Sequence, residues 1–242
     1  ATVLSFPPRH TLLPKTILRK AYHVLAFALF APGQLLHPET LQLAYAAALA
    51  LLISLEIVRA SRLGPVSDLL QNFIKDQVDE RDSGLLVLTH IYLLLGCAIP
   101  SWLSSSFSTA STSPFASLPP LAGVLILGVG DTAASVYGTL AGRRRWVRGA
   151  SKGKTVEGTV AGALCTSAAA LALLAFLSSS SSSAAATAAS SSASDDSFSV
   201  RGAAGVVAAT AATCLLEAFT DQIDNLVLPI WYFAMLALAL GA

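Results

Sequence analysis

The chain has 242 residues, of which 54% are hydrophobic and 12% are charged, and its formal net charge is +1. A soluble domain normally carries about 25% charged residues, so this composition excludes an ordinary soluble globular protein and predicts a membrane protein. We expect membrane lipids, and no nucleic acid, among its partners.

Hydrophobic spans alternate with polar segments along the chain, and several reach the roughly twenty residues that a helix needs to cross a bilayer. They predict an all-α fold, a polytopic transmembrane helix bundle with about seven spans. Two Ser/Ala-rich segments, 101–118 and 178–200, are expected to be flexible loops. The spans cover residues 21–36, 41–58, 85–103, 119–140, 156–177, 203–219 and 226–242.

The chain begins with Ala1, without an initiator Met or the charged region of a signal peptide. We therefore expect a fragment, the C-terminal part of a longer membrane protein. Within it, residues 1–242 are expected to form a single membrane-embedded domain.

Basic residues are distributed unequally between the two sides that seven alternating crossings would create. Fourteen of the 15 Lys and Arg residues fall on one side, and only Arg201 falls on the other. An excess of Lys and Arg marks the cytoplasmic side of a membrane protein. The main polar segments collect on that side too, so we expect a site at the cytoplasmic membrane face.

A short motif with basic residues and a histidine opens the first span. His23 follows Arg19 and Lys20, which makes it a candidate site residue. A lone His at such a position is more often part of a hydrogen-bonded structure, and this is the alternative interpretation.

The segment 64–84 carries apolar residues at helical spacing between positions 69 and 74. This pattern predicts a short amphipathic helix that lies on the cytoplasmic membrane surface. The segment ends in an acidic run with Asp79 and Asp82 as candidate site residues and Arg81 as a candidate phosphate ligand. Helix capping and solvation are the alternative for this run.

A carboxylate lies inside the fourth span. Asp131 follows Gly128 and Gly130, which allow a close backbone approach or a break in the helix. An ionisable side chain at membrane depth costs about 2.5–3.5 kcal/mol on insertion scales, so it usually signals function. We predict that Asp131 holds a divalent cation or orients a nucleophile, with Gly130 and Thr132 as phosphate contacts. A structural ion pair is the alternative.

A basic turn at 143–154 leads into the fifth span. Lys154 and Thr155 open a predicted helix, and helix N-termini bind anions through free N–H groups and the helix dipole. Lys152, Lys154 and Thr155 are therefore predicted phosphate ligands, and Glu157 is a candidate acid, base or metal ligand. For the arginines, an ordinary topogenic loop is the alternative.

Oxygen-bearing side chains cluster between the last two spans, at a spacing that would put them on one helical face. Oxygen ligands of this kind suit Mg²⁺, which typically uses one or two carboxylates together with phosphate oxygens and water. A solvated loop is the alternative. The predicted face carries Glu217, Asp221, Asp224 and Asn225, with Gln222 beside them as a further candidate.

Together these segments resemble a known enzyme family. The unit from Gly130-Asp131 to Glu157-Gly158 is similar to membrane enzymes that use CTP, namely polyprenol kinases and CDP-diacylglycerol synthases. The motifs at 19–23, 79–93 and 217–226 resemble dolichol kinase specifically. The resemblance covers most of residues 17–232 and is to the C-terminal catalytic half of that family.

The resemblance implies a CTP-dependent lipid kinase that phosphorylates dolichol to dolichyl phosphate. The reaction would take place at the cytoplasmic face of the endoplasmic reticulum membrane and supply the lipid carrier for protein glycosylation. Asp131 or Glu157 would be catalytic, and Asp131 and Asp224 would hold a divalent cation, Mg²⁺. Asp224 is preferred over Asp221, because position 221 is expected to be Thr in animal members. The CTP phosphates would contact Arg81, Gly130, Thr132, Lys152, Lys154 and Thr155.

Three other interpretations remain open at this stage. A membrane cytidylyltransferase of the CDP-diacylglycerol synthase type would use the same Gly-Asp and Lys-Thr-x-Glu-Gly unit. Another polyprenol kinase would act on phytol or farnesol. A transporter is the non-enzyme alternative, because intramembrane carboxylates and broken helices also mark ion paths.

Overall fold

The computed structural model describes most of the chain as helix. Apart from one isolated antiparallel bridge between Arg145 and Thr155, every regular element in the described residues is helical. The described residues are 15–62, 64–75, 86–107, 114–146, 153–185, 200–220 and 224–240. Six candidate site residues lie outside them, namely Asp79, Arg81, Asp82, Lys152, Asp221 and Gln222.

The predicted all-α polytopic fold is confirmed. Among the described residues, four helical stretches are long and apolar enough to cross a membrane: Pro38–Ser61, Phe115–Ala141, Val156–Ser179 and Val200–Phe219. A shorter apolar helix covers Asp224–Leu240. The count of seven spans stays a prediction. The helices are α1 (Lys15–Leu36), α2 (Pro38–Ser61), α3 (Gly64–Lys75), α4 (Thr89–Phe107), α5 (Ala122–Leu125), α6 (Thr132–Ala141), α7 (Val156–Ala185), α8 (Val200–Phe219) and α9 (Asp224–Leu240).

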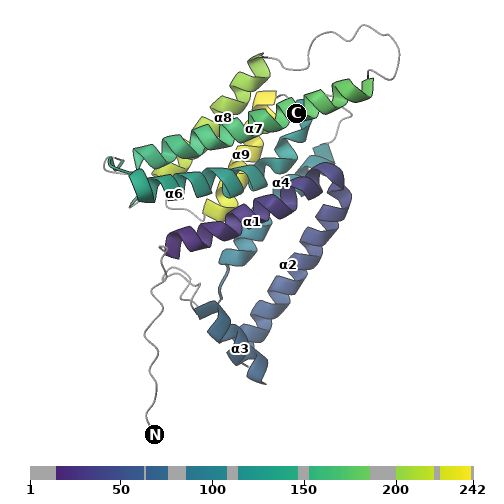
Figure 1. Cartoon of the computed structure of the whole chain (residues 1–242). Coiled ribbons are helices and arrows are strands. Elements are labelled where there is room, and N and C mark those ends of the chain that lie inside the picture. The colour runs from purple at the N-terminus through teal and green to yellow at the C-terminus, as the bar shows by residue number, and fades with distance from the viewer. Residues whose placement is uncertain are drawn as a thin grey trace.

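Helices α1, α6 and α7 lie side by side, with α4, α8 and α9 completing the bundle (Figure 1). Helix α2 turns back from the end of α1, packs on α4 and leads to the short α3 (Figure 1). Helix α3 falls within the predicted amphipathic segment 64–84, of which the structure describes residues 64–75.

The span predicted at 119–140 is helical throughout but is not one continuous α-helix. Two 3-10 turns, Pro114–Ser117 and Pro119–Leu121, precede α5, and a π-helical turn, η4 (Ile126–Asp131), joins α5 to α6. This interrupted stretch is buried at the centre of the bundle, between α1, α4, α7 and α9. Asp131 is the last residue of the π-helical turn, so the two glycines before it lie where the helical hydrogen-bond pattern changes and the helix continues into α6.

Small residues bring the helices together. A Cβ atom on Gly158 of α7 would lie 2.6 Å from the carbonyl oxygen of Ala134 in α6. A Cβ atom on Gly162 would lie 3.0 Å from the carbonyl oxygen of Gly130. The spacing of these two glycines therefore serves close helix packing, as is common in lipid.

Two helices run further into the Ser/Ala-rich segments than the hydrophobic spans do. Helix α4 continues to Phe107 and α7 to Ala185, past the predicted span ends at 103 and 177. Hydropathy falls where Ser replaces Leu, but the backbone of α7 continues as helix through six consecutive serines, and the hydroxyls of Ser178 and Ser179 donate to the backbone oxygens of Ala175 and Phe176.

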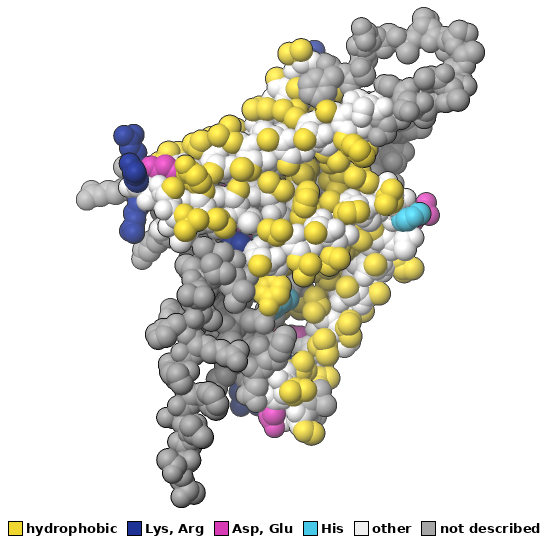
Figure 2. Space-filling model, in the orientation of Figure 1, with side chains coloured by type: hydrophobic (Ala, Val, Ile, Leu, Met, Phe, Trp, Pro, Cys, Tyr) yellow, Lys and Arg dark blue, Asp and Glu magenta, His cyan; other side chains and the backbone are white. Residues whose placement is uncertain are grey.

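The surface separates apolar and basic residues. Large apolar side chains are exposed along the helices, including Leu43 on α2, Leu164 on α7 and Leu238 on α9. Figure 2 shows dark blue basic side chains at one end of the molecule, where α6 ends and α7 begins. We call this the basic end; Arg143–Arg145 are exposed there.

Candidate functional site

Ionisable side chains from five parts of the chain meet toward the basic end. They come from the start of α1, the end of η4, the residue pair before α7, the end of α8 and the start of α9. We call this set the polar cluster. It consists of Lys20, His23, Asp131, Lys154, Glu217, Asp224 and Asn225.

Asp131 is the centre of the first part of the cluster. Its Oδ2 atom forms an ion pair with the ammonium group of Lys20 and lies 3.4 Å from His23 Nε2. Its Oδ1 atom accepts a hydrogen bond of 3.4 Å from Ser135. His23 Nε2 also lies 3.3 Å from Asn225 Oδ1, which links α1 to the start of α9. A carboxylate this deeply buried needs such partners, because an unpaired buried charge is costly.

Lys154 is the centre of the second part. Its ammonium group lies 2.6 Å from the backbone oxygen of Glu217, 3.0 Å from Asp224 Oδ2 and 3.5 Å from Glu217 Oε1. One cation therefore connects the segment before α7 with the end of α8 and the start of α9.

The two parts belong to one electrostatic unit. Asp131 interacts with the charge of Lys154, and both Glu217 and Asp224 interact with the charges of Asp131 and Lys20. Within the described residues, the cluster brings together three carboxylates and two ammonium groups. This arrangement can bind an anion through the ammonium groups and a cation through the carboxylates.

The predicted single helical face at 217–225 is wrong. Helix α8 ends at Phe219 and α9 begins at Asp224, so Glu217 and Asp224 belong to different helices. They nevertheless meet at Lys154, because α8 and α9 pack against each other as an antiparallel pair.

Thr155 and Glu157 lie at the start of α7 and bond locally. The Thr155 hydroxyl accepts a hydrogen bond from the backbone N–H of Gly158 at 3.2 Å, which is an N-cap contact. Both carboxylate oxygens of Glu157 accept from the backbone N–H of Arg144 at 3.1 Å. The carboxylate of Glu157 therefore binds the basic turn, whereas Lys154 two residues before α7 binds the polar cluster.

Gly130 and Thr132 lie beside Asp131 but contact protein groups. A Cβ atom on Gly130 would lie 2.7 Å from Thr166 Oγ1, so this glycine allows α7 to approach η4. The Thr132 hydroxyl donates to the backbone oxygen of Leu127 at 3.4 Å. Their role as phosphate contacts stays a prediction.

Sequence reasoning missed Lys20 and Ser135 as members of the site. The signal for Lys20 was its spacing of three residues from His23, which puts both side chains on one face of a helix. Ser135 follows Asp131 by four residues on the same helical stretch, where i and i+4 side chains are neighbours.

The residues present fit a divalent cation only together with phosphate oxygens. No group of three or more His, Cys, Asp and Glu side chains among the described residues is arranged to hold a metal alone. However, Asp224 Oδ1 is buried and has no hydrogen-bond partner among the residues that the structure describes. Mg²⁺ usually needs only one or two carboxylates beside phosphate oxygens and water, so Asp224 and Asp131 suit it chemically.

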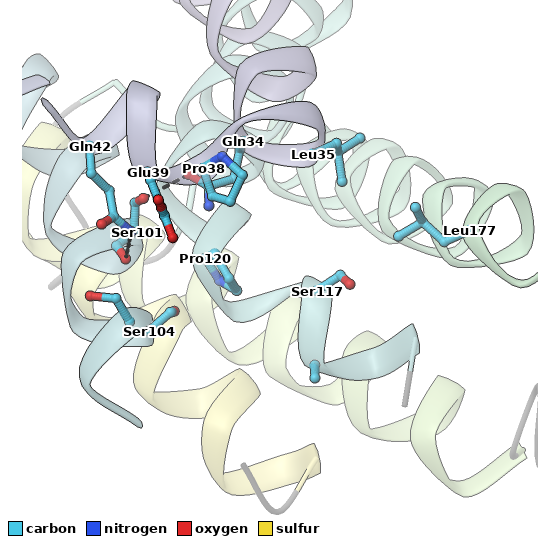
Figure 3. Close-up of a pocket in the computed structure, with 12 residues that line it drawn as sticks. Gln34, Leu35, Pro38, Glu39, Gln42, Ser101, Ser104, Ser117, Pro120 and Leu177 are labelled. Carbon is cyan, nitrogen blue, oxygen red and sulfur yellow. Dashed lines mark hydrogen bonds between the residues drawn. The ribbon is translucent and has the colours of Figure 1, made fainter. Parts of the chain in front are cut away.

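A cavity of about 520 Å³ lies at the opposite end of the bundle, between the end of α1, the start of α2 and α4 (Figure 3). Ser101 donates to Gln34 Oε1 at 2.7 Å beside it, and Gln42 donates to the backbone oxygen of Ser101 at 3.0 Å. The described residues that line this cavity include no Lys, Arg or His, so it does not suit a phosphate-bearing ligand. The polar cluster is the better candidate for one.

Comparison with known proteins identifies the family. The family model for dolichol kinase matches residues 9–220. The chain belongs to the dolichol kinase family. It is 37% identical over 230 residues to dolichol kinase EVAN of Arabidopsis thaliana, which covers 95% of this chain and 36% of that protein. It is 37% identical over 223 residues to dolichol kinase of Homo sapiens, which covers 91% of this chain and 38% of that protein.

A shorter match extends the comparison to fungi. The chain is 40% identical over 144 residues to dolichol kinase sec59 of Schizosaccharomyces pombe, with 59% of this chain and 27% of that protein covered. No solved structure matches the chain. The chain spans little more than a third of the length of the plant and human dolichol kinases. The resemblance found in the sequence motifs is confirmed as family membership.

Proposed function

We propose that this chain carries the catalytic site of a CTP-dependent dolichol kinase. It transfers the γ-phosphoryl group of CTP to the hydroxyl of dolichol at the cytoplasmic face of the endoplasmic reticulum membrane, and dolichyl phosphate then serves protein glycosylation. The relatives, which are named dolichol kinases, support the reaction and the acceptor. The observation that carries the proposal is the polar cluster, in which ammonium groups and carboxylates meet between apolar helices.

Phosphoryl transfer needs mainly positioning and charge neutralisation, and the cluster suits both. CTP binds at the basic end, where its phosphates reach the ammonium groups of the cluster. Dolichol stays in the bilayer against the exposed apolar helix faces, and only its hydroxyl reaches Asp131. The enzyme then has no need to extract the long chain from the lipid.

In the reaction, the bond between the γ-phosphorus and the oxygen that bridges it to the β-phosphate breaks. A bond from the γ-phosphorus to the dolichol oxygen forms, and CDP leaves with the electron pair of the broken bond. Asp131 accepts the hydroxyl proton. We prefer Asp131 to Glu157 as the base, because both oxygens of Glu157 accept from the Arg144 backbone and its carboxylate positions the basic turn.

A divalent cation, Mg²⁺, is part of the proposal. Asp224 and Asp131 would hold it, and it would neutralise charge on the phosphate oxygens. The buried Asp224 Oδ1 atom, which has no hydrogen-bond partner in the described part of the chain, supports this assignment.

The decisive experiment uses CTP labelled on the γ-phosphate and membranes that contain the protein, with dolichol, phytol and farnesol as acceptors. We expect the label in dolichyl phosphate. Asp131→Asn should abolish the transfer, and Asp68→Asn, a matched change at an exposed carboxylate of α3, should not. Label released as pyrophosphate would instead support a cytidylyltransferase, and label in phytol or farnesol alone would change the acceptor.

A further inference from the structure

The two ammonium groups of the polar cluster, those of Lys20 and Lys154, differ in the number of oxygen atoms that they contact. A lysine ammonium group has three N–H donors. Lys154 has three oxygens within 3.5 Å, two from Glu217 and one from Asp224. Among the described residues, the ammonium group of Lys20 contacts a single carboxylate oxygen, that of Asp131. Only the contacts with the backbone oxygen of Glu217 and with Asp224 Oδ2 are hydrogen bonds of Lys154, because Glu217 Oε1 lies at 3.5 Å. Within the described part of the chain, Lys20 therefore has more donors left for a ligand than Lys154 has.

The start of α7 offers few donors to a phosphate. The backbone N–H of Val156 donates to the Arg144 oxygen at 2.9 Å, and that of Gly158 donates to Thr155 Oγ1 at 3.2 Å. Thr155 itself is the cap. The groups that normally make a helix N-terminus an anion site are thus partly used within the protein.

Lys20 is well placed to donate hydrogen bonds to a phosphate group. It lies near the start of α1 and its side chain is 16% exposed, against 7% for Asp131. The ammonium group of Lys20 is therefore more accessible than the carboxylate that it contacts, although the Lys154 side chain, at 23%, is more exposed still. A phosphate that arrives from the basic end meets Lys20 at the carboxylate that is proposed to receive the hydroxyl proton.

We propose that Lys20 binds the phosphoryl group that is transferred. This inference rests on the proposed function and assigns a substrate contact within the same site. Lys20 can bridge Asp131 and the γ-phosphate, because its stem is flexible and its three donors point in different directions. It would thereby set the distance between the base and the phosphorus that the dolichol oxygen attacks.

The test compares the binding of CTP and CDP to purified protein in lipid nanodiscs. A residue that contacts the γ-phosphoryl group contributes to the affinity for CTP and not for CDP. A hydrogen bond between charged groups predicts that Lys20→Met weakens CTP binding about 10- to 100-fold and leaves CDP binding within a few-fold. Lys154→Met should change both affinities together, and Arg62→Met, at an exposed cation outside the cluster, should change neither.

Lys20→Met removes the ammonium group that contacts Asp131, so it is also paired with a second change. Asp131→Asn alone retains Lys20 and should keep the preference for CTP, and the double variant Lys20→Met, Asp131→Asn should lose it. This comparison needs no catalytic activity. The preference surviving in the double variant, or disappearing in Lys154→Met instead, would overturn the assignment.

The same experiment separates the two proposals. If the wild-type protein binds neither nucleotide, the proposed function fails and this inference with it. If the wild-type protein transfers phosphate and Lys20→Met keeps its preference for CTP, only the assignment of Lys20 fails.

Discussion

Replacement of Lys154 by Met tests whether this lysine holds three helices together. The variant removes the cation that contacts Glu217 and Asp224 and keeps most of the side-chain volume. Breaking a buried ion pair by removing one partner costs about 3–5 kcal/mol. The Glu217 side chain is 10% exposed and qualifies as buried, whereas Asp224 is 30% exposed and is partly screened by solvent. We therefore expect a loss of about 2–3 kcal/mol in the free energy of unfolding.

The measurement is equilibrium unfolding in mixed micelles of a mild detergent and dodecyl sulfate, followed by circular dichroism. The expected loss corresponds to an unfolding constant that rises about 30- to 150-fold. Lys154→Arg keeps the charge and should lose less. Adding Glu217→Gln to Lys154→Met should recover part of the stability, because it removes the unpaired buried charge. A Lys154→Met protein as stable as the wild type, or a double variant less stable than Lys154→Met, would refute the reasoning.

Three further predictions follow from other contacts. Gly158→Ala should destabilise the protein by about 1–3 kcal/mol in the same unfolding assay, because its Cβ would lie 2.6 Å from the Ala134 backbone oxygen. Arg59→Met should cost about 3–5 kcal/mol, because Glu56 is buried and bonded to Arg59 at 2.6 and 2.8 Å; adding Glu56→Gln should restore most of this. Glu157→Gln should lower kcat in the γ-label assay by less than about tenfold, because Glu157 positions the basic turn. Loss of a general base would lower kcat by about 10²–10⁴-fold. A loss of that size would instead identify Glu157 as the base.

The fold class was predictable because hydropathy alone decides it. Long apolar spans separated by charged turns allow a helical bundle in lipid and little else. Hydropathy does not report the hydrogen-bond pattern inside a span, so the π-helical turn at 126–131 was visible only as two glycines before Asp131. The last two spans were predicted as separate, and α8 and α9 are separate helices, but the helical spacing of the polar residues at 217–225 wrongly indicated one helical face across the gap between them.

The sequence allowed the residue types of the site to be predicted, but not which cation contacts which carboxylate. Asp131 stood out because a charged side chain is rare in an apolar span. Lys154 stood out at a predicted helix start, and Asp224 stood out among clustered carboxylates between two spans. Which cation binds which carboxylate depends on contacts between distant parts of the chain. Lys20 and Asp131 are 111 residues apart, and Lys154 and Asp224 are 70 apart. Without the packing of the helices, no local pattern indicates these pairs.

That packing depends on glycines next to the charged residues. A Cβ atom on Gly128 would lie 3.3 Å from the backbone oxygen of His23, so this glycine lets η4 approach the part of α1 that carries Lys20. A Cβ atom on Gly96 of α4 would overlap the backbone oxygen of Asn225 at the start of α9. Helices in lipid associate through such close contacts between small residues.

The ion pairs of the polar cluster therefore depend on the glycines that let the helices approach. An ion pair loses its value when the two groups move apart, and bulky side chains at these contacts would separate the helices that carry them. The glycines allow short distances between the helices. At these distances Lys20 reaches from α1 to Asp131 of η4, and Lys154 reaches from the start of α7 to α8 and α9. A substitution at Gly128 or Gly96 should therefore weaken nucleotide binding although neither residue is a member of the polar cluster.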